Sequence, residues 1–563
     1  MSDMSGLQLA LTALQAQQRS VDVSAQNVAN ANTPGYSRET VNLVNIGAPA
    51  VPARYATFSG AGQGVKVDSV TRFRDQFMEI RAALEHGSMA SLDQASSTMN
   101  SIQQLFNEPS DSGIQQQLSD FWSGFDDVAN NPSDTAARTQ LLERADTLAA
   151  SFNSVSQSLT QQKNDTISEL GATVSSINTM SQQIAQLNKS IKVNTIAGLA
   201  VNDLEDQRDL LANQLAEASG ATLREGSFNQ VDVMLNGTAL VQEDTSNTLN
   251  VDTSGSGAVL RWASDNSAAT VTSGKAGGEL EAINATIPNY LAKLDNVATT
   301  LRDQVNQVHG AIGGSLAVGD QDQSAAGNLQ FDVSLDGGAF TTVTIPGADW
   351  SGAGGDVALQ AAMQGAIDTA VGAGNVTATV TGGNGSPLAI SVVPAAGHQL
   401  QVQTTGGTTG FATLLGSTAV GADGIGGRPL FTGTDAATFA VAPGVEGNPN
   451  GIAAGTAAGG PLDSSVALDL AEMGSSQTGA DAVYRQMIVQ LGVDTQTATN
   501  RDQIQQTATT SLDNARSQES GVSIDEEMTN LIEYQHGYDA AARLLTTVDT
   551  MLDTLINHTG LTT

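Results

Sequence analysis

The sequence of 563 residues contains no cysteine, and only 4% of its residues are aromatic. A chain without cysteine forms no disulfides, thiolate metal sites or cysteine nucleophiles. Basic residues are also scarce: 23 stand against 58 acidic ones, the net charge is −35, and no Lys follows Lys293. Such a chain offers little basic surface to neutralise phosphates. Nucleic-acid and membrane-surface partners are therefore disfavoured.

Long apolar runs are missing as well. No stretch of roughly 18 consecutive apolar residues occurs, so we expect no membrane insertion. Residues 1–18 contain neither a basic leader nor a continuous apolar core, and we expect any export to proceed without a cleaved signal peptide. The length of 563 residues predicts roughly three or four domains, each with its own core.

The best-defined element is a helix from Ser523 to about His558. Ser523 and Glu526 have the spacing of a capping box, and acidic residues follow at the positive end of the helix dipole. Apolar residues then recur at alternating steps of three and four, which is the pattern of a coiled-coil seam. The residues of this C-terminal seam are Leu531, Tyr534, Tyr538, Ala541, Leu545, Val548, Leu552 and Leu555.

A second seam with the same spacing lies at the other end of the chain. Its residues are Leu7, Leu11, Leu14, Gln18, Val21, Ala25 and Val28. A helix with a single apolar stripe needs a partner to cover it. We therefore expect the two ends to pair with each other or with the ends of neighbouring copies, and we expect the apolar seam residues to form an assembly interface.

The N-terminal helix is followed by a tight turn, Thr33-Pro34-Gly35-Tyr36, in which Pro supplies a fixed φ and Gly a positive one. The surrounding segment, SAQNVANANTPGYSRETVNL, resembles the N-terminal signature of the bacterial flagellar rod, hook and hook-associated axial proteins. The matching residues are Asn27, Asn30, Asn32, Pro34, Gly35 and Tyr36. The C-terminal run from Glu533 to Asn557 is similar to the C-terminal helix of the same family. Two signatures at opposite ends carry more weight than the capping chemistry that either would indicate alone.

Two further segments resemble the hook–filament junction members of that family: NDLEDQRD, from Asn202, and NQVHG, which ends at Gly310. The acidic residues of NDLEDQRD are spread around two helical turns instead of converging on a metal, and Arg208 can bridge its neighbours, so we expect a solvated helix face. His309 in NQVHG has no nearby acid or nucleophile. We expect a packed or hydrogen-bonded histidine in preference to a catalytic base.

No catalytic, metal or cofactor site is predicted. The segment Asp320–Ser324 begins like a calcium loop, but Ala325 and Phe331 replace the Gly and Glu that such a loop needs. No Gly-rich stretch of the Gly- and Thr-rich region precedes Lys-Ser or Lys-Thr, so a phosphate-binding loop is not supported either.

The fold class predicted is α+β and multi-domain, with paired terminal coiled-coil helices, a long helical bundle and inserted β-rich domains. Apolar periodicity predicts one helix over most of 133–194, a second near 279–312 and, within a β-rich insertion, a single helix over 357–371. The predicted domains are 1–35 with 521–563 (terminal coiled coil), 36–220 with 278–312 and 450–520 (helical bundle), 221–277 (small β region), 313–430 (inserted β domain) and 431–449 (return segment).

The resemblance implies a structural protein, not an enzyme, that polymerises through its terminal helices into an adaptor ring between hook and filament. The partners it implies are like subunits, the hook protein, the second junction protein and an export chaperone at the C-terminal helix. The location it implies is extracellular, at the hook–filament junction, after type III export. Two alternatives stay open: another axial protein of hook or rod type, or a secreted protein whose β insertion, with His398 as its only histidine, carries an activity.

Overall fold

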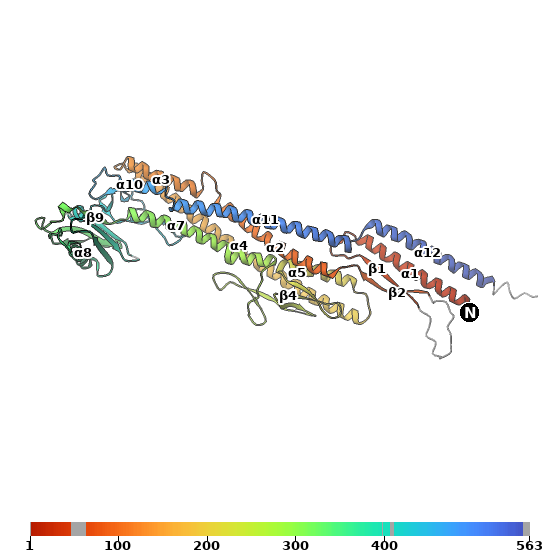
Figure 1. Ribbon diagram of the computed structural model, residues 1–563. Coiled ribbons are helices and arrows are strands. Elements are labelled where there is room, and N and C mark those ends of the chain that lie inside the picture. The colour runs from red at the N-terminus through yellow and green to blue at the C-terminus, as the bar shows by residue number, and fades with distance from the viewer. Residues whose placement is uncertain (1, 47–63, 397, 406–409, 555–563) are drawn as a thin grey trace, which may run out of the picture. The chain divides into compact units, whose positions relative to one another are not determined.

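A computed structural model describes residues 2–46, 64–396, 398–405 and 410–554 (Figure 1). The chain divides into two compact units, one made of residues 1–97, 166–284 and 497–563 and the other of residues 98–165 and 285–496. Both contain long helices and antiparallel sheets. The expected α+β, multi-domain class is thus confirmed. None of the helices within the described ranges is both long and apolar enough to cross a membrane.

The first unit contains the two chain ends, parts of three long helices and a small β region. Its helices are α1 (Ser2–Asn30), the first part of α2 (Gln76–Phe106), the last part of α4 (Thr135–Ile196), α5 (Asn202–Ser219), α6 (Gly274–Glu281) with the start of a π-helical turn (Ala282–Thr286), the last part of α11 (Ala480–Ser520), and α12 (Ile524–Asp553). Its strands are β1 (Glu39–Asn45), β2 (Val65–Arg72), β3 (Thr222–Glu225), β4 (Val231–Leu235), β5 (Thr238–Gln242), β6 (Thr245–Ser246), β7 (Leu249–Asp252) and β8 (Val259–Trp262).

The terminal helices α1 and α12 lie side by side (Figure 1). They run antiparallel, because Gly6 lies next to Val548 whereas Gly537 lies next to Gln17. A Cβ atom at position 537 would lie only 2.7 Å from the side-chain carbon Cδ of Gln17. The absent side chain therefore lets the two helices approach closely at this point. The expected pairing of the chain's two ends is present within a single copy.

The core of the first unit lies between helices and the small β region. Leu170 and Ile177 of α4 pack with Leu215 of α5, Val233 of β4 and Trp262 of β8. Strands β3 to β6 form one antiparallel sheet in chain order, and β7 pairs with β8. The β region expected within 221–277 therefore covers the apolar sides of α4 and α5.

The second unit combines helices with two larger sheets. Its helices are α3 (Ile114–Asn130), the remaining parts of α2, α4 and α11, α7 (Ile287–His309), α8 (Gly355–Val371), α9 (Gly410–Leu414), α10 (Ser465–Met473) and the 3₁₀ turns Val318–Asp320 and Pro449–Gly451. Its strands are β9 (Gly313–Leu316), β10 (Leu329–Leu335), β11 (Thr341–Ile345), β12 (Val376–Thr381), β13 (Leu388–Pro394), β14 (Leu400–Gln403), β15 (Ala419–Gly421), β16 (Ile425–Gly426), β17 (Phe431–Thr432), β18 (Ala440–Val441) and β19 (Ala453–Thr456).

One sheet of this unit has the strand order β11-β10-β14-β16-β15-β19, and another has the order β12-β13-β9. Helix α8 packs against β11 and β12, one strand from each sheet. Its side chains Leu359, Met363 and Ile367 enter the core together with Phe331 and Trp350. The single helix expected over 357–371 is thus confirmed. The helix expected over 133–194 is also confirmed, with α4 spanning 135–196.

Candidate functional site

The end of α1 is built around the side chain of Asn27, which is buried. Its Nδ2 donates to the carbonyl of Glu39 (2.9 Å), and its Oδ1 accepts from the Glu39 N–H (2.9 Å) and from the Tyr36 hydroxyl (2.8 Å). The amide thus pairs with the first residue of β1 as a neighbouring strand would. Asn27 and Tyr36 therefore fix where the chain turns from α1 into the β1–β2 hairpin.

The turn itself has the predicted chemistry. The Tyr36 N–H donates to the Thr33 carbonyl at 3.2 Å, and Gly35 has φ +80°. A Cβ at Gly35 would lie 3.0 Å from Cβ of Leu210 on α5, so Gly also permits a close approach. Asn30 closes the helix end, since its Nδ2 donates to Gln26 O (3.1 Å) and its Oδ1 accepts from Thr33 Oγ1 (3.2 Å). The motif residues found in the sequence thus meet in one turn against α5.

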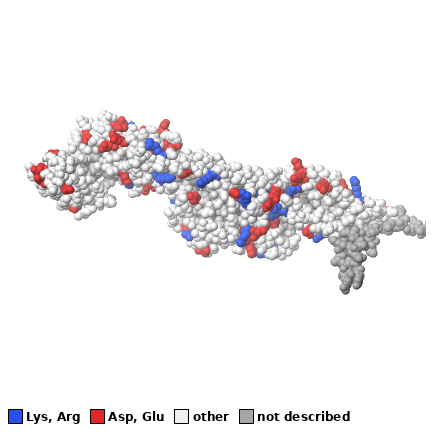
Figure 2. All heavy atoms as spheres, viewed as in Figure 1, with Lys and Arg blue, Asp and Glu red and all other residues white. Residues whose placement is uncertain are grey.

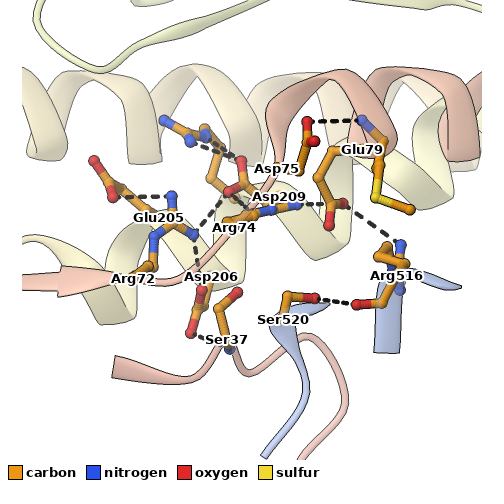
Figure 3. A network of polar contacts seen from close by, with 12 residues as sticks. Ser37, Arg72, Arg74, Asp75, Glu79, Glu205, Asp206, Asp209, Arg516 and Ser520 are labelled. Atoms are coloured by element: carbon orange, nitrogen blue, oxygen red, sulfur yellow. Dashed lines mark hydrogen bonds and ion pairs between the residues drawn. The ribbon is translucent and has the colours of Figure 1, made fainter. Parts of the chain in front are cut away.

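The NDLEDQRD segment forms the start of α5 and makes a buried ion-pair network, drawn in Figure 3. Arg72, at the end of β2, contacts Glu205 (2.9 Å), Asp206 (2.7 Å) and Asp209 (2.8 Å). Arg74 also pairs with Asp209. Arg208 bridges to Asp209 at 2.6 Å.

This network corrects the expectation of a solvated helix face. Glu205, Asp206, Arg208 and Asp209 are all buried, each with at most 9% of its surface exposed. The prediction was wrong because Arg72 and Arg74, which approach from a hairpin more than 120 residues earlier in the chain, cover this face. The spacing of residues along the helix indicated only that Arg208 could pair with its acidic neighbours.

Electrostatics in the network favour the charged form of Asp209. Burial alone would raise the pKa of Asp209, but the adjacent guanidiniums of Arg208, Arg74 and Arg72 outweigh it and hold the pKa below its ordinary value. Burial would likewise lower the pKa of Arg72, and its carboxylate partners raise it instead. Three carboxylates of this segment, Glu205, Asp206 and Asp209, are therefore paired with guanidiniums of the same chain.

The network extends to both chain ends. The Ser37 N–H donates to Asp206 (3.1 Å), which joins the turn after α1 to α5. Arg74 also pairs with Glu79 at the start of α2 (2.6 Å), and Arg516 near the end of α11 reaches the same carboxylate at 3.5 Å (Figure 3).

Arg38 makes the direct connection between the two end signatures. It contacts Glu527 at 2.7 Å and Glu526 at 3.1 Å, both in the first turn of α12. Glu527 is 2% exposed, so the first of these pairs is largely shielded from solvent. The predicted cap of α12 is present, since Ser523 accepts from the Glu526 N–H. Segments nearly 490 residues apart in sequence are thereby tied together at the base of the α1–α12 pair.

The predicted seam residues occupy different positions in the two helices. On α12, Ala541 is buried and Tyr538 is 37% exposed. The other described seam residues of α12 are half-buried: Leu531, Tyr534, Leu545, Val548 and Leu552. Leu555 lies outside the described residues. The stripe expected on α12 therefore largely coincides with its least exposed side.

On α1 the predicted seam and the buried side differ. Leu7, Leu14, Val21 and Val28 are half-buried, and Leu11 is 46% exposed. The fully buried residues of α1 are mostly small or polar: Ala10, Ala16, Ser20, Val23, Ser24 and Asn27. The reason is that α1 contacts the β1–β2 hairpin as well as α12, so burial is not confined to one apolar stripe.

In the second unit, the NQVHG motif ties α7 to the return segment. His309 is 1% exposed, with Nδ1 lying 2.7 Å from the Arg428 carbonyl and Nε2 accepting the Ala453 N–H at 2.9 Å. These partners require a neutral ring protonated on Nδ1. Asn306 makes a similar clamp, its amide bonded to the backbone of Leu430 and Phe431. The expectation of a hydrogen-bonded histidine is confirmed.

Comparisons with known proteins agree with these motifs. Residues 99–316 match the family model of the helical domain of flagellar hook-associated protein FlgK. Residues 7–36 match the model of the flagella basal body rod protein, and residues 515–558 match that of the C-terminal part of the flagellar basal body rod FlgEFG protein. Flagellar hook-associated protein 1 of Bacillus subtilis is 28% identical over 99% of both chains. That of Escherichia coli is 27% identical over 97% of this chain and 98% of its own. The solved hook junction protein FlgK of Burkholderia pseudomallei is 18% identical with a TM-score of 0.47, covering 78% of this chain and 99% of its own.

The rod-type matches at both ends, together with the meeting of these ends in the structure, define the class: a flagellar axial protein. Within this class the chain is similar over nearly its whole length to flagellar hook-associated protein 1 of two bacteria, and over residues 99–316 to the FlgK helical domain. Its role is therefore structural, at the hook–filament junction of the bacterial flagellum.

Proposed function

We propose that copies of this chain polymerise through their terminal helices into a ring that joins hook to filament. The observation that carries the proposal is the antiparallel α1–α12 pair, anchored at its base by the ion pairs of Arg38 with Glu526 and Glu527. Because apolar residues of these helices stay partly exposed in one copy, neighbouring copies can cover them. We propose that most of the predicted seam residues pack as a coiled coil between α1 and α12 within each copy. The exposed ones, Leu11 and Tyr538, are proposed to contact neighbouring copies.

The proposed partners are like subunits within the ring, the hook protein on one side and the second junction protein on the other. An export chaperone is proposed to bind α12 before assembly, since an amphipathic helix with an exposed apolar side suits a chaperone groove. With the chain divided into terminal, bundle and β-rich domains as predicted, we propose that the terminal helices make the contacts along the flagellum. The β-rich insertion, 313–430, is proposed to face outward.

The role we propose is non-catalytic. Residues that could have suggested a catalytic site have structural partners instead. Glu205, Asp206 and Asp209 of α5 bind guanidiniums, and His309 is bonded to the backbone on both ring nitrogens. On the face shown in Figure 2, basic residues lie singly or beside acidic ones. Ion pairs of this kind hold elements of the fold together, which suits a structural role.

Electron microscopy of a deletion strain tests the proposal. Cells without the gene should carry complete hooks with no filament, and the wild-type gene supplied in trans should restore attached filaments. Cells that lack the gene and still carry normally attached filaments would contradict it. Cells that lack the hook as well would favour the rod or hook alternative.

A further inference from the structure

The start of α2 presents an exposed apolar face. Phe77, Ile80 and Leu84 follow one another at steps of three and four, and their exposed fractions are 73%, 36% and 52%. Side chains at this spacing lie on one side of a helix. We call these three residues, together with Arg81, the α2 face. Arg81 lies within it, 61% exposed and 3.8 Å from Glu85.

The face continues into a groove with a volume of about 840 Å³. Ile80 lines this groove together with Leu199 and Phe228, which are themselves 61% and 52% exposed. Arg19 also lines it. The exposed apolar area is therefore larger than one helical stripe. Arg81 and Arg19 lie beside it, and the other charged residues that line the groove are of both signs. An apolar area of this kind on a protein surface marks an interaction site.

The start of α12 carries a second exposed stripe of opposite charge. Ile524, Met528 and Ile532 recur every four residues and are 49%, 46% and 51% exposed. We call them the α12 face. The chain contains no Lys or Arg between Arg516 and Arg543, whereas five carboxylates fall between Ile524 and Asp539 inclusive. Arg38 pairs with two of these carboxylates, Glu526 and Glu527, and the other three leave the stripe apolar with a net negative charge.

We propose that the α2 face of one copy binds the α12 face of a second copy, which rests on the proposed ring. A ring in which every copy is equivalent needs two different, complementary surfaces on each copy. These two faces are both apolar and differ in charge, so they attract each other. Pairing two α2 faces would oppose Arg81 to Arg81, and pairing two α12 faces would oppose carboxylates, so contact between like faces is disfavoured. Both faces are exposed within a single chain, so they do not cover each other there.

The absence of cysteine from the sequence makes cross-linking a direct test. The deletion strain expresses two chains that carry tags of different length, one with Leu84→Cys and the other with Met528→Cys. Intact flagella from these cells are then oxidised to form disulfides. The contact predicts a cross-linked dimer of mixed length, and no dimer when either variant is expressed alone. As the matched control, Val357→Cys on α8, 69% exposed, replaces Leu84→Cys and should give no mixed dimer. Dimers formed by either variant alone, or assembled flagella without the mixed dimer, would overturn the proposal.

A charge placed in the face separates this inference from the proposed ring. Leu84→Asp should lower the number of attached filaments by roughly tenfold or more, because burying an unpaired carboxylate at the contact costs more than the 1.4 kcal/mol that a factor of ten represents. Val357→Asp should leave filament number unchanged, and circular dichroism should show both variants folded. If the wild-type gene restores filaments and Leu84→Asp restores them equally, the α2 contact is wrong while the junction role stands. If deletion leaves filaments attached, the junction role itself fails.

Discussion

At the scale of single residues, Arg72 contributes most to holding the α5 carboxylates. Replacing it with Met leaves Glu205, Asp206 and Asp209 without their shared cation in a buried site. Removing one partner of a buried ion pair typically destabilises a protein by about 3–5 kcal/mol. We expect Arg72→Met to lower the free energy of unfolding by that order, measured by urea denaturation.

A neighbouring residue of the same strand provides the control. Lys66 and Asp68 are 3.4 Å apart, and their side chains are 59% and 53% exposed. Exposed pairs contribute roughly 0–1 kcal/mol, so Lys66→Met should change stability little. Equal effects of the two substitutions would show that the α5 network is solvated and that its burial is not structurally important.

His309 makes the second unit sensitive to acid. Burial lowers the pKa of its ring to about 4, against an ordinary value of 6.5. The folded chain therefore keeps His309 neutral while the unfolded chain takes up a proton below pH 6.5. Its contribution to stability is complete above pH 6.5 and is lost as the pH falls towards 4, at about 1.4 kcal/mol per pH unit.

The measurement compares urea midpoints from pH 7 to pH 4 in His309→Gln and the wild type. The amide of glutamine offers both N–H donors and an acceptor oxygen without titrating, so the variant should lose the part of the acid sensitivity that falls between pH 6.5 and 4. An unchanged pH dependence in His309→Gln would mean that the ring is hydrated in solution.

Sequence reasoning at this scale succeeded where chemistry is local. The Pro34-Gly35 turn and the Ser523 cap depend on residues within four positions of one another, and both are present. It failed at the α5 carboxylates, because their partners Arg72 and Arg74 arrive through the tertiary fold. The roles of Asn27 and Asn306 as backbone clamps could have been suspected from their place in a motif, but the strands they hold were not identifiable in advance.

At the scale of elements, the α1–α12 pair depends on the inner side of α12. Leu545 is half-buried there, whereas its neighbour Leu544 is 42% exposed. We expect Leu545→Asp to separate the two helices in the purified monomer, since a charge at a shielded contact loses hydration without gaining a partner. Limited proteolysis should then remove both chain ends quickly and leave a resistant middle fragment.

Leu544→Asp is the matched control, with the same substitution one residue away on the exposed side. It should leave the cleavage rate of the monomer unchanged. If the two variants are cleaved equally fast, the α1–α12 pair does not form in the isolated monomer, and the terminal helices order only on assembly. If Leu545→Asp instead causes global loss of helicity, α12 belongs to the central core.

The terminal helices also show how far periodicity predicts packing. On α12 the apolar stripe and the shielded side largely coincide, because one neighbour, α1, covers this helix. On α1 two neighbours, α12 and the β1–β2 hairpin, bury small and polar residues that an apolar seam does not predict. The bounds of α4 and α8 were predicted closely. Helix α4 has a long apolar repeat, and the apolar repeat of α8 stands alone within a β-rich region. Helix α10 was not predicted, since its nine residues give too short a pattern.

At the scale of the whole molecule, a junction protein occurs at only one place along the length of the flagellum. Localising the chain in intact flagella tests this most directly. Val357→Cys supplies a thiol on an exposed helix of a chain that has no cysteine of its own, and a maleimide–gold label marks it for electron microscopy. We expect a single band of label at the boundary between hook and filament in each flagellum. Label distributed along the hook or the filament, or confined to the rod, would contradict it.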